Sequence, residues 1–186
     1  MTTLPLRPLL AFLSLLLALP ALAQPESPVH VSASITPASV PPGGKALITV
    51  TFAIDGSWHI YPPDWSALNG PEGTGVLSTA EVPSPPPGIS PRKAQWPKPT
   101  VKTVGTGKAA ELSAFYEGRT PVYIPITIDA GATPGEREIK VTWSSQACTE
   151  KGVCLMEEPG EATLKLTIAA DASRTIPAPP AWPDGF

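Results

Sequence analysis

Proline is the residue that most limits how this chain can fold. Twenty-six of the 186 residues are proline, and they occur along the whole sequence. Proline lacks a backbone N–H and its ring clashes with the preceding helical turn, so long helices cannot form between such closely spaced prolines. Yet 42% of the residues are hydrophobic, which is more than a disordered chain carries. The sequence therefore predicts a β-rich domain with many turns.

Five segments alternate hydrophobic and polar residues with the period of two that half-buried strands show. Turn-forming pairs such as Asp55-Gly56 and Pro159-Gly160 lie between them. Two shorter strands are expected at 58–61 and 76–82, and no segment has a helical period. This pattern predicts an all-β fold, an immunoglobulin-like antiparallel β-sandwich. The five alternating segments are 29–35, 48–54, 122–128, 139–143 and 164–168.

Three stretches lack this alternation. Residues 83–99 contain seven prolines and are expected to form an extended loop. Residues 101–110 are small and include glycine, so we expect them to be irregular as well. Residues 170–186 are expected to form a proline-rich tail. The sandwich domain itself is predicted to span residues 24–169.

The first 23 residues have the pattern of a secretory signal peptide. Arg7 precedes an apolar run at 9–19, and Ala21-Leu22-Ala23 supplies the small residues of a cleavage site. The run has 11 residues, whereas a membrane-spanning helix needs about 20. We therefore expect cleavage after Ala23, export of the protein, and no membrane span in the mature chain.

Charge and motif content exclude several classes of function. The chain has 13 basic and 16 acidic residues, for a net charge of −3. Nucleic-acid binding needs a basic surface to neutralise phosphates, so no nucleic-acid partner is expected. The sequence also has no Gly-x-Ser-x-Gly motif of a hydrolase and no glycine-rich phosphate-binding motif.

Cys148 and Cys154 are the two cysteines of the chain. Export places the chain in an environment where a disulfide can form. A turn at Gly152 can bring the two Cα atoms within the range of about 4.4–6.8 Å that disulfides need. Closing so short a loop contributes only roughly 2–3 kcal/mol to stability. A bond of this kind suits a disulfide that opens and closes better than one that holds a fold together.

Spacing alone leaves three interpretations of this pair open: a structural disulfide, a redox-active pair or part of a metal site. The local charge is mainly acidic, because Glu150, Glu157 and Glu158 outnumber Lys151. Acidic neighbours do not lower the pKa of a thiol. A redox-active disulfide here is therefore expected to be attacked by the more reactive thiolate of a partner.

Four short motifs, taken in order, resemble a known family. They resemble the periplasmic N-terminal domain of DsbD, a membrane protein that conducts reducing equivalents between thiols and disulfides, and of its ScsB-like relatives. The motifs are Gly56-Ser57-Trp58-His59-Ile60-Tyr61, Gln95-Trp96-Pro97, Tyr116-Glu117-Gly118 and Cys148-x5-Cys154.

The resemblance implies an immunoglobulin-like fold and a redox-active disulfide that needs no cofactor. In that family, which is connected with cytochrome c biogenesis, the domain takes electrons from a thioredoxin-like domain and passes them to periplasmic proteins. Carried over, Cys154 is the exchanging sulfur and Cys148 the resolving one. The protein would then be periplasmic and would act as a thiol–disulfide oxidoreductase component.

The family also has two aromatic positions beside the disulfide and a cap loop over it. Tyr61 matches one aromatic position, and His59 stands where the relatives have tyrosine. Strand period places both side chains on one face, although an ordinary strand position is the alternative for His59. The cap is expected at Thr103, Val104 and Gly105.

The chain ends at Phe186, without the membrane domain and the thioredoxin-like domain of DsbD. We therefore expect partners in trans: thioredoxin-fold periplasmic proteins or a DsbD-like membrane protein. Two other functions stay open. One is Cu(I) binding by the soft ligands Cys148, Cys154 and Met156, with no metal site expected otherwise. The other is a non-catalytic binding domain with a structural disulfide.

Overall fold

The computed structural model describes residues 26–68, 73–104 and 111–170. Within these ranges the chain forms twelve strands and no helix. The predicted signal peptide, residues 171–186 of the predicted tail and Gly105 of the predicted cap lie outside the described residues. The domain boundaries therefore stay a prediction.

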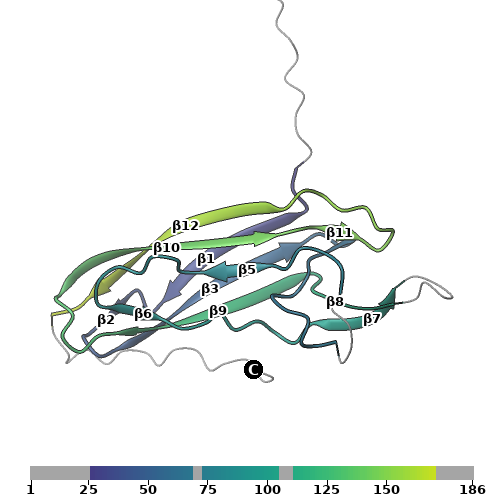
Figure 1. The fold of residues 1–186 in the computed structure, drawn as a ribbon. Coiled ribbons are helices and arrows are strands. Elements are labelled where there is room, and N and C mark those ends of the chain that lie inside the picture. The colour runs from purple at the N-terminus through teal and green to yellow at the C-terminus, as the bar shows by residue number, and fades with distance from the viewer. Residues whose placement is uncertain (1–25, 69–72, 105–110, 171–186) are drawn as a thin grey trace, which may run out of the picture.

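Two four-stranded sheets pack into a sandwich (Figure 1). All five alternating segments form strands in it, so the prediction of an all-β, immunoglobulin-like sandwich is confirmed. The first sheet has the order β1 (Val29–Thr36), β3 (Lys45–Ile54), β9 (Arg119–Ile128) and β6 (Ile89–Pro91). The second has the order β2 (Ser39–Val40), β12 (Glu158–Ile168), β10 (Gly135–Ser145) and β5 (Thr79–Glu81).

The core lies between the two sheets and is built from alternate strand positions. In β9, for example, Val122, Ile124, Ile126 and Ile128 are all buried, as the period of two predicts. Each such aliphatic side chain contributes about 1.5–3 kcal/mol when fully removed from water.

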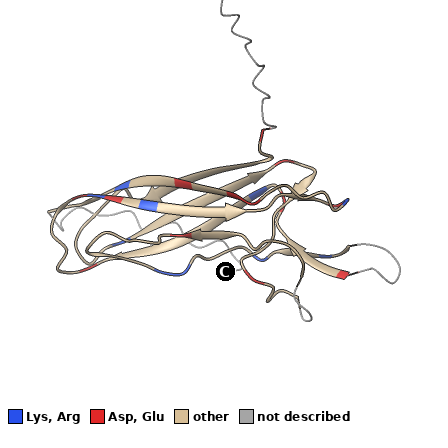
Figure 2. Ribbon diagram, turned by 45° about the horizontal axis from the view of Figure 1, so that its top comes forward, with Lys and Arg blue, Asp and Glu red and all other residues tan. Residues whose placement is uncertain are grey.

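The outward faces of β10 and β12 carry the charges instead. Acidic and basic residues lie side by side along these two strands (Figure 2), where Lys140 pairs with Glu161 at 2.6 Å and Lys165 with Glu136 at 3.1 Å. These pairs are exposed, so each adds at most about 1 kcal/mol.

Strand β12 begins at Glu158, earlier than the alternation indicates, because the Pro159-Gly160 pair does not form a turn. Gly160 lies opposite Trp143 of β10, and a Cβ at Gly160 would come within 2.4 Å of the indole nitrogen. Glycine at this position therefore leaves room for the Trp143 ring on the strand. Pro159 is tolerated because β2 pairs only with the far end of β12.

The stretches expected to be irregular contain strands. Residues 83–99 include β6, and the prediction for 101–110 is wrong over its first four residues, which belong to β7 (Thr100–Val104). β7 pairs with β8 (Glu111–Phe115). The sheets are antiparallel with one exception: β2 runs parallel to β12, after the chain crosses from the first sheet to the second between β1 and β2.

One end of the sandwich carries two small additional sheets. β4 (Trp58–His59) pairs with β11 (Cys148–Thr149), and β7 pairs with β8. Figure 1 shows β11, β8 and β7 at the same end of the molecule. The cysteines and most of the predicted site residues therefore gather at this end.

Candidate functional site

Cys148 and Cys154 form a disulfide across a small hairpin between β10 and β12. The sulfur atoms are 2.06 Å apart, and the Cα atoms are 4.1 Å apart, slightly closer than expected. The two residues lie directly opposite each other in a non-hydrogen-bonded position. The flanking hydrogen bonds run from the Thr149 N–H to the Val153 oxygen at 2.8 Å and from the Leu155 N–H to the Ala147 oxygen at 2.9 Å.

Gly152 closes this hairpin, as the sequence predicts. Its φ of 79° lies in the left-handed region that glycine adopts without a steric cost. Its N–H donates to the Thr149 oxygen at 2.9 Å, which completes a tight turn.

The two sulfur-bearing residues differ sharply in exposure. Cys148 is only 1% exposed, whereas Cys154 is an exposed residue. Large apolar side chains near Cys154 are also open to solvent: Val153, Leu155 and, at 88% exposed, Met156. Among the described residues, Cys154 is therefore the more accessible of the two cysteines.

His59 pairs with Cys148 across β4 and β11, and its ring is buried between two aromatic rings. The ring centroids are 5.4 Å away for Tyr61, in an edge-on arrangement, and 4.9 Å away for Phe115. The structure thus brings both predicted aromatic positions, His59 and Tyr61, to one buried face.

Burial lowers the pKa of His59 below its usual 6.5, because the charged imidazolium loses water contacts. Glu117 and Glu150 act in the opposite direction, and Lys102 adds to the lowering. The lowered pKa favours the neutral imidazole at pH 7.

Tyr61 is held by tight packing on both sides. Its ring lies 5.5 Å from that of Trp65, and burial raises the pKa of its hydroxyl. On the other side, Gly75 approaches so closely that a Cβ there would come within 2.2 Å of the Tyr61 ring. Gly75 also has a φ of 123°, which only glycine adopts readily.

The β7–β8 hairpin provides the predicted cap region. Lys102 of β7 lies 5.0 Å from the centroid of the Phe115 ring and pairs with Glu117 at 3.4 Å and with Glu150 of the cysteine hairpin at 4.0 Å. The residues predicted for the cap, Thr103 and Val104, lie in β7 on this hairpin. Their role as a cap over the disulfide stays a prediction.

Two further motifs pack against each other rather than against the cysteines. Trp96 stacks on Tyr116 at 5.7 Å, and the Tyr116 hydroxyl donates to the Pro97 oxygen at 2.7 Å. The Tyr116 backbone exchanges hydrogen bonds with Ile60, next to His59. These motif residues therefore fix the position of the strand that carries His59.

Sequence reasoning missed Phe115, Lys102 and Gln146 as parts of the site. Phe115 could have been found from its place next to the Tyr116-Glu117-Gly118 motif. Gln146 could have been found from its position two residues before Cys148, which puts both side chains on one face of an extended chain. Lys102 has no such signal, since only the fold brings it to the hairpin.

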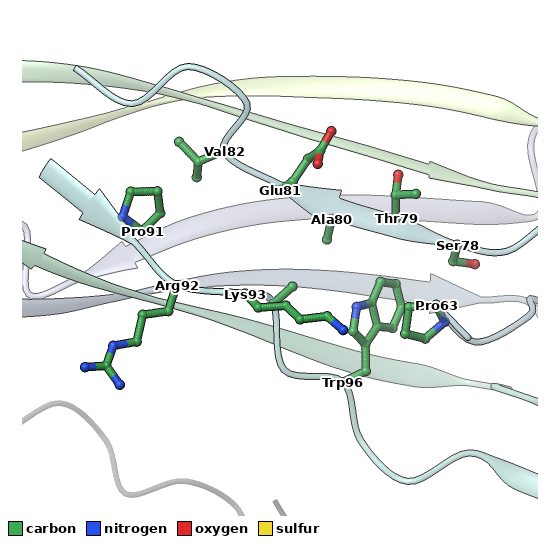
Figure 3. A pocket seen from close by; sticks show the side chains of 11 residues that line it. Pro63, Ser78, Thr79, Ala80, Glu81, Val82, Pro91, Arg92, Lys93 and Trp96 are labelled. Atoms are coloured by element: carbon green, nitrogen blue, oxygen red, sulfur yellow. The ribbon is translucent and has the colours of Figure 1, made fainter. Parts of the chain in front are cut away.

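A groove of about 390 Å³ opens elsewhere, between the edge strands β5 and β6 (Figure 3). Lys93, Trp96 and Ser78 are among the residues that line it. It includes none of the predicted site residues.

The described residues contain no metal-binding cluster that would support copper binding. Over residues 26–68, 73–104 and 111–170, no group of three or more His, Cys, Asp or Glu side chains could hold a metal ion. Cys148 and His59 are buried, whereas Met156 points to solvent. Copper binding stays a prediction.

The family described as thiol:disulfide interchange protein DsbD, N-terminal, matches residues 26–167. The chain belongs to this family. The match extends over both sheets and includes the disulfide hairpin, so the resemblance noted in the sequence is confirmed. No curated protein matches the chain in sequence.

Two solved structures of the DsbD type are similar to the chain. The N-terminal periplasmic domain of ScsB from Proteus mirabilis is 16% identical, with a TM-score of 0.45, over 84% of this chain and 52% of that one. The chain thus spans about half the length of that protein. The N-terminal domain of Neisseria meningitidis DsbD in the reduced form is 16% identical, with a TM-score of 0.44, over 80% of this chain and 96% of that one.

None of the described residues forms a helix able to cross a membrane.

Proposed function

We propose that the protein is a periplasmic thiol–disulfide exchange module that passes reducing equivalents between thioredoxin-like partners. The observation that carries the proposal is the unequal exposure of the disulfide, with Cys154 open to solvent and Cys148 buried. Membership of the DsbD N-terminal family supports the same chemistry. In this proposal Cys154 is the exchanging sulfur and Cys148 the resolving one.

The exchange proceeds in two displacement steps. A thiolate of a reduced partner attacks Cys154 Sγ, the Sγ–Sγ bond breaks, and the electron pair leaves on Cys148 Sγ, which takes up a proton. The second thiolate of the partner then attacks the partner sulfur that is bonded to Cys154 Sγ in the mixed disulfide. Cys154 leaves as a thiolate, which is protonated. The partner is oxidised to a disulfide, and the module gains two electrons and two protons. The reverse steps reduce the next partner.

The partners that fit this proposal are separate thioredoxin-fold proteins or a DsbD-like membrane protein. The exposed side chains of Val153, Leu155 and Met156 offer an apolar contact beside Cys154. Residues 1–23 would direct export to the periplasm and would then be removed.

The redox potential of the Cys148–Cys154 pair tests the proposal. The protein is equilibrated in glutathione buffers, and the oxidised fraction is measured by trapping free thiols. We expect a potential between about −180 and −280 mV, the range of exchanging disulfides. The Cys148→Ser/Cys154→Ser variant supplies the blank. A potential below about −300 mV would mean that the disulfide is structural and that the domain is a non-catalytic binding module.

One observation favours a second candidate, Cu(I) binding. The Met156 thioether is exposed two residues from Cys154, and a thioether and a thiolate are soft ligands. Titration of the reduced protein with Cu(I) tests this candidate. Binding no tighter than that of the Cys148→Ser/Cys154→Ser variant would end it.

A further inference from the structure

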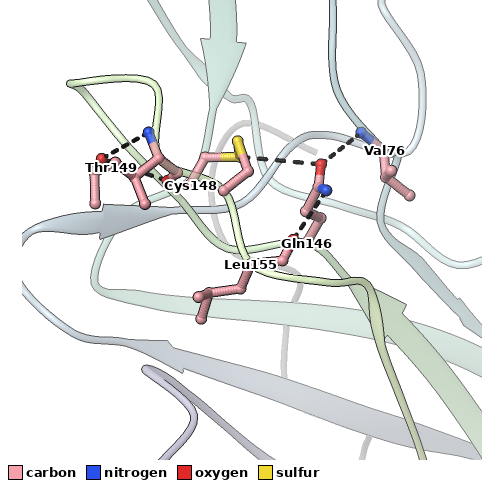
Figure 4. The surroundings of a disulfide bond; sticks show 7 residues. Val76, Gln146, Cys148, Thr149 and Leu155 are labelled. Carbon is pink, nitrogen blue, oxygen red and sulfur yellow. Dashed lines mark hydrogen bonds between the residues drawn. A yellow bond between two sulfur atoms is a disulfide. The ribbon is translucent and has the colours of Figure 1, made fainter. Parts of the chain in front are cut away.

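Gln146 connects the two cysteines to the rest of the molecule (Figure 4). It lies directly after β10 and two residues before Cys148. Its Nε2 donates to the Leu155 oxygen at 3.0 Å, and its Oε1 accepts from the Val76 N–H at 3.3 Å. The same Oε1 lies 3.9 Å from Cys148 Sγ.

These two backbone partners fix which end of the amide faces the sulfur. A backbone N–H can only donate and a carbonyl oxygen can only accept, so Val76 requires the amide oxygen and Leu155 requires the amide nitrogen. A flipped amide would lose both hydrogen bonds. The group next to Cys148 Sγ is therefore an acceptor that is already oriented.

We propose that Gln146 is a positioning residue for the disulfide exchange, because its Oε1 accepts a hydrogen bond from the Cys148 thiol once the disulfide is reduced. This inference rests on the proposed function of the pair. A disulfide sulfur has no hydrogen to donate, so the hydrogen bond exists only in the reduced protein. Gln146 thereby favours the reduced state over the oxidised state.

The hydrogen bond acts on the first displacement step. When a partner thiolate attacks Cys154 Sγ, the electron pair leaves on Cys148 Sγ, which is buried and has to be protonated. Gln146 Oε1 then stabilises the S–H that forms. At the same time its Nε2 donates to the Leu155 carbonyl oxygen. This hydrogen bond keeps the chain next to Cys154 in place while the disulfide is reduced.

Two titratable residues neighbour Cys148: His59, its cross-strand partner on β4, and Glu150, two residues further along the cysteine hairpin. Lys102 on β7 and Glu117 after β8 act on His59. Gln146 differs from all of them, because it does not titrate and its Oε1 lies 3.9 Å from Cys148 Sγ. Substitution of Gln146 leaves these four groups unchanged.

The first test measures the pKa of Cys148 in the Cys154→Ser background, in which Cys148 is the single thiol. Gln146→Met removes the acceptor at nearly constant side-chain volume, so the neutral thiol loses stability and the pKa of Cys148 should fall by about half a unit, which is a threefold change. Gln146→Glu places a carboxylate beside the sulfur and should raise that pKa. Thiolate absorbance in the ultraviolet follows both titrations.

The second test measures the equilibrium constant for reduction by glutathione in the two-cysteine protein. Gln146→Met should lower it about threefold relative to the wild type, because the hydrogen bond of the reduced state is lost. Gln95→Met, at another partly buried glutamine, is the matched control and should leave both quantities unchanged.

Opposite pKa shifts for Gln146→Met and Gln146→Glu support the proposal. Shifts of the same sign, or no shift in either variant while both remain folded, would overturn it. The pKa measurement needs no exchange with any partner, so it still decides the role of Gln146 if the redox potential turns out to be that of a structural disulfide.

Discussion

Cys148 and His59 lie directly opposite each other in the antiparallel pair of β11 and β4. The buried cysteine is therefore paired with a histidine that is itself 7% exposed and enclosed by Tyr61 and Phe115. A charged imidazolium at this place would be poorly solvated, which links the stability of this end of the molecule to pH.

The first prediction concerns that link. The pKa of His59 is lowered by burial, so as the pH falls below about 6.5 the unfolded chain binds a proton that the folded chain does not. The free energy of unfolding should therefore decrease between pH 7.5 and 5.5 and level off below the folded pKa of His59. Denaturant titrations at several pH values measure this. His59→Phe should remove most of the dependence in this window, while His30→Phe, at an exposed position of β1, should keep it. An unchanged slope in His59→Phe would contradict the assignment.

The second prediction concerns the charges around His59. Glu117 raises the pKa of His59 and Lys102 lowers it, so Glu117→Gln should lower that pKa further and Lys102→Met should raise it. The ion pair between the two is exposed, so neither variant should change stability by more than about 1 kcal/mol. NMR titration of the His59 imidazole gives both shifts. Glu136→Gln, on the outer face of β10, serves as the control. Shifts of equal sign in the first two variants would rule out this electrostatic account.

The third prediction concerns the two thiols. Cys154 in the Cys148→Ser variant should react with iodoacetamide about tenfold faster or more than Cys148 in the Cys154→Ser variant, because only the former residue is exposed. The rates are followed by mass spectrometry. In denaturant the two rates should become similar, which checks that burial is the cause. Equal rates in the folded proteins would remove the basis for assigning Cys154 as the exchanging sulfur.

The fourth prediction concerns Gly75 and Tyr61. Gly75→Ala should destabilise the fold by about 2–4 kcal/mol, because the new Cβ meets the Tyr61 ring and the φ of 123° strains any other residue. Thermal and denaturant unfolding measure the loss. Gly56→Ala is the matched control, since a Cβ there meets nothing within 4 Å and its φ is not positive. A loss of similar size in both variants would show that the contact with Tyr61 is not the cause.

The long strands could be predicted because one face of each is apolar and buried at every second residue. In β3 and β9 the inward positions are aliphatic or aromatic except Thr120, so the period of two is visible in the sequence, although Leu47 and Thr51 on the other face of β3 are buried as well. β7 could not be found this way: four of its five residues are exposed, so burial leaves no alternation to detect. β6 ends on a proline and has three residues, too few for a periodic signal.

The site was predictable only as far as it is local in sequence. The cysteine spacing and the His59–Tyr61 face follow from short-range pattern. The contact of Lys102 with Phe115 and Glu150 joins residues that are 13 and 48 positions apart, and it depends on how the β7–β8 hairpin packs on the end of the sandwich. The orientation of the Gln146 amide likewise depends on Val76, seventy residues away.

The cysteine hairpin belongs to neither of the two large sheets and pairs with β4 through only two residue pairs. Opening its disulfide therefore leaves the hydrogen-bond ladders of the sandwich untouched. In the proposed exchange, a partner that binds this end of the sandwich therefore meets the same two sheets in the oxidised and the reduced protein. Any difference by which that partner distinguishes the two redox states has to come from the hairpin and the few side chains around it.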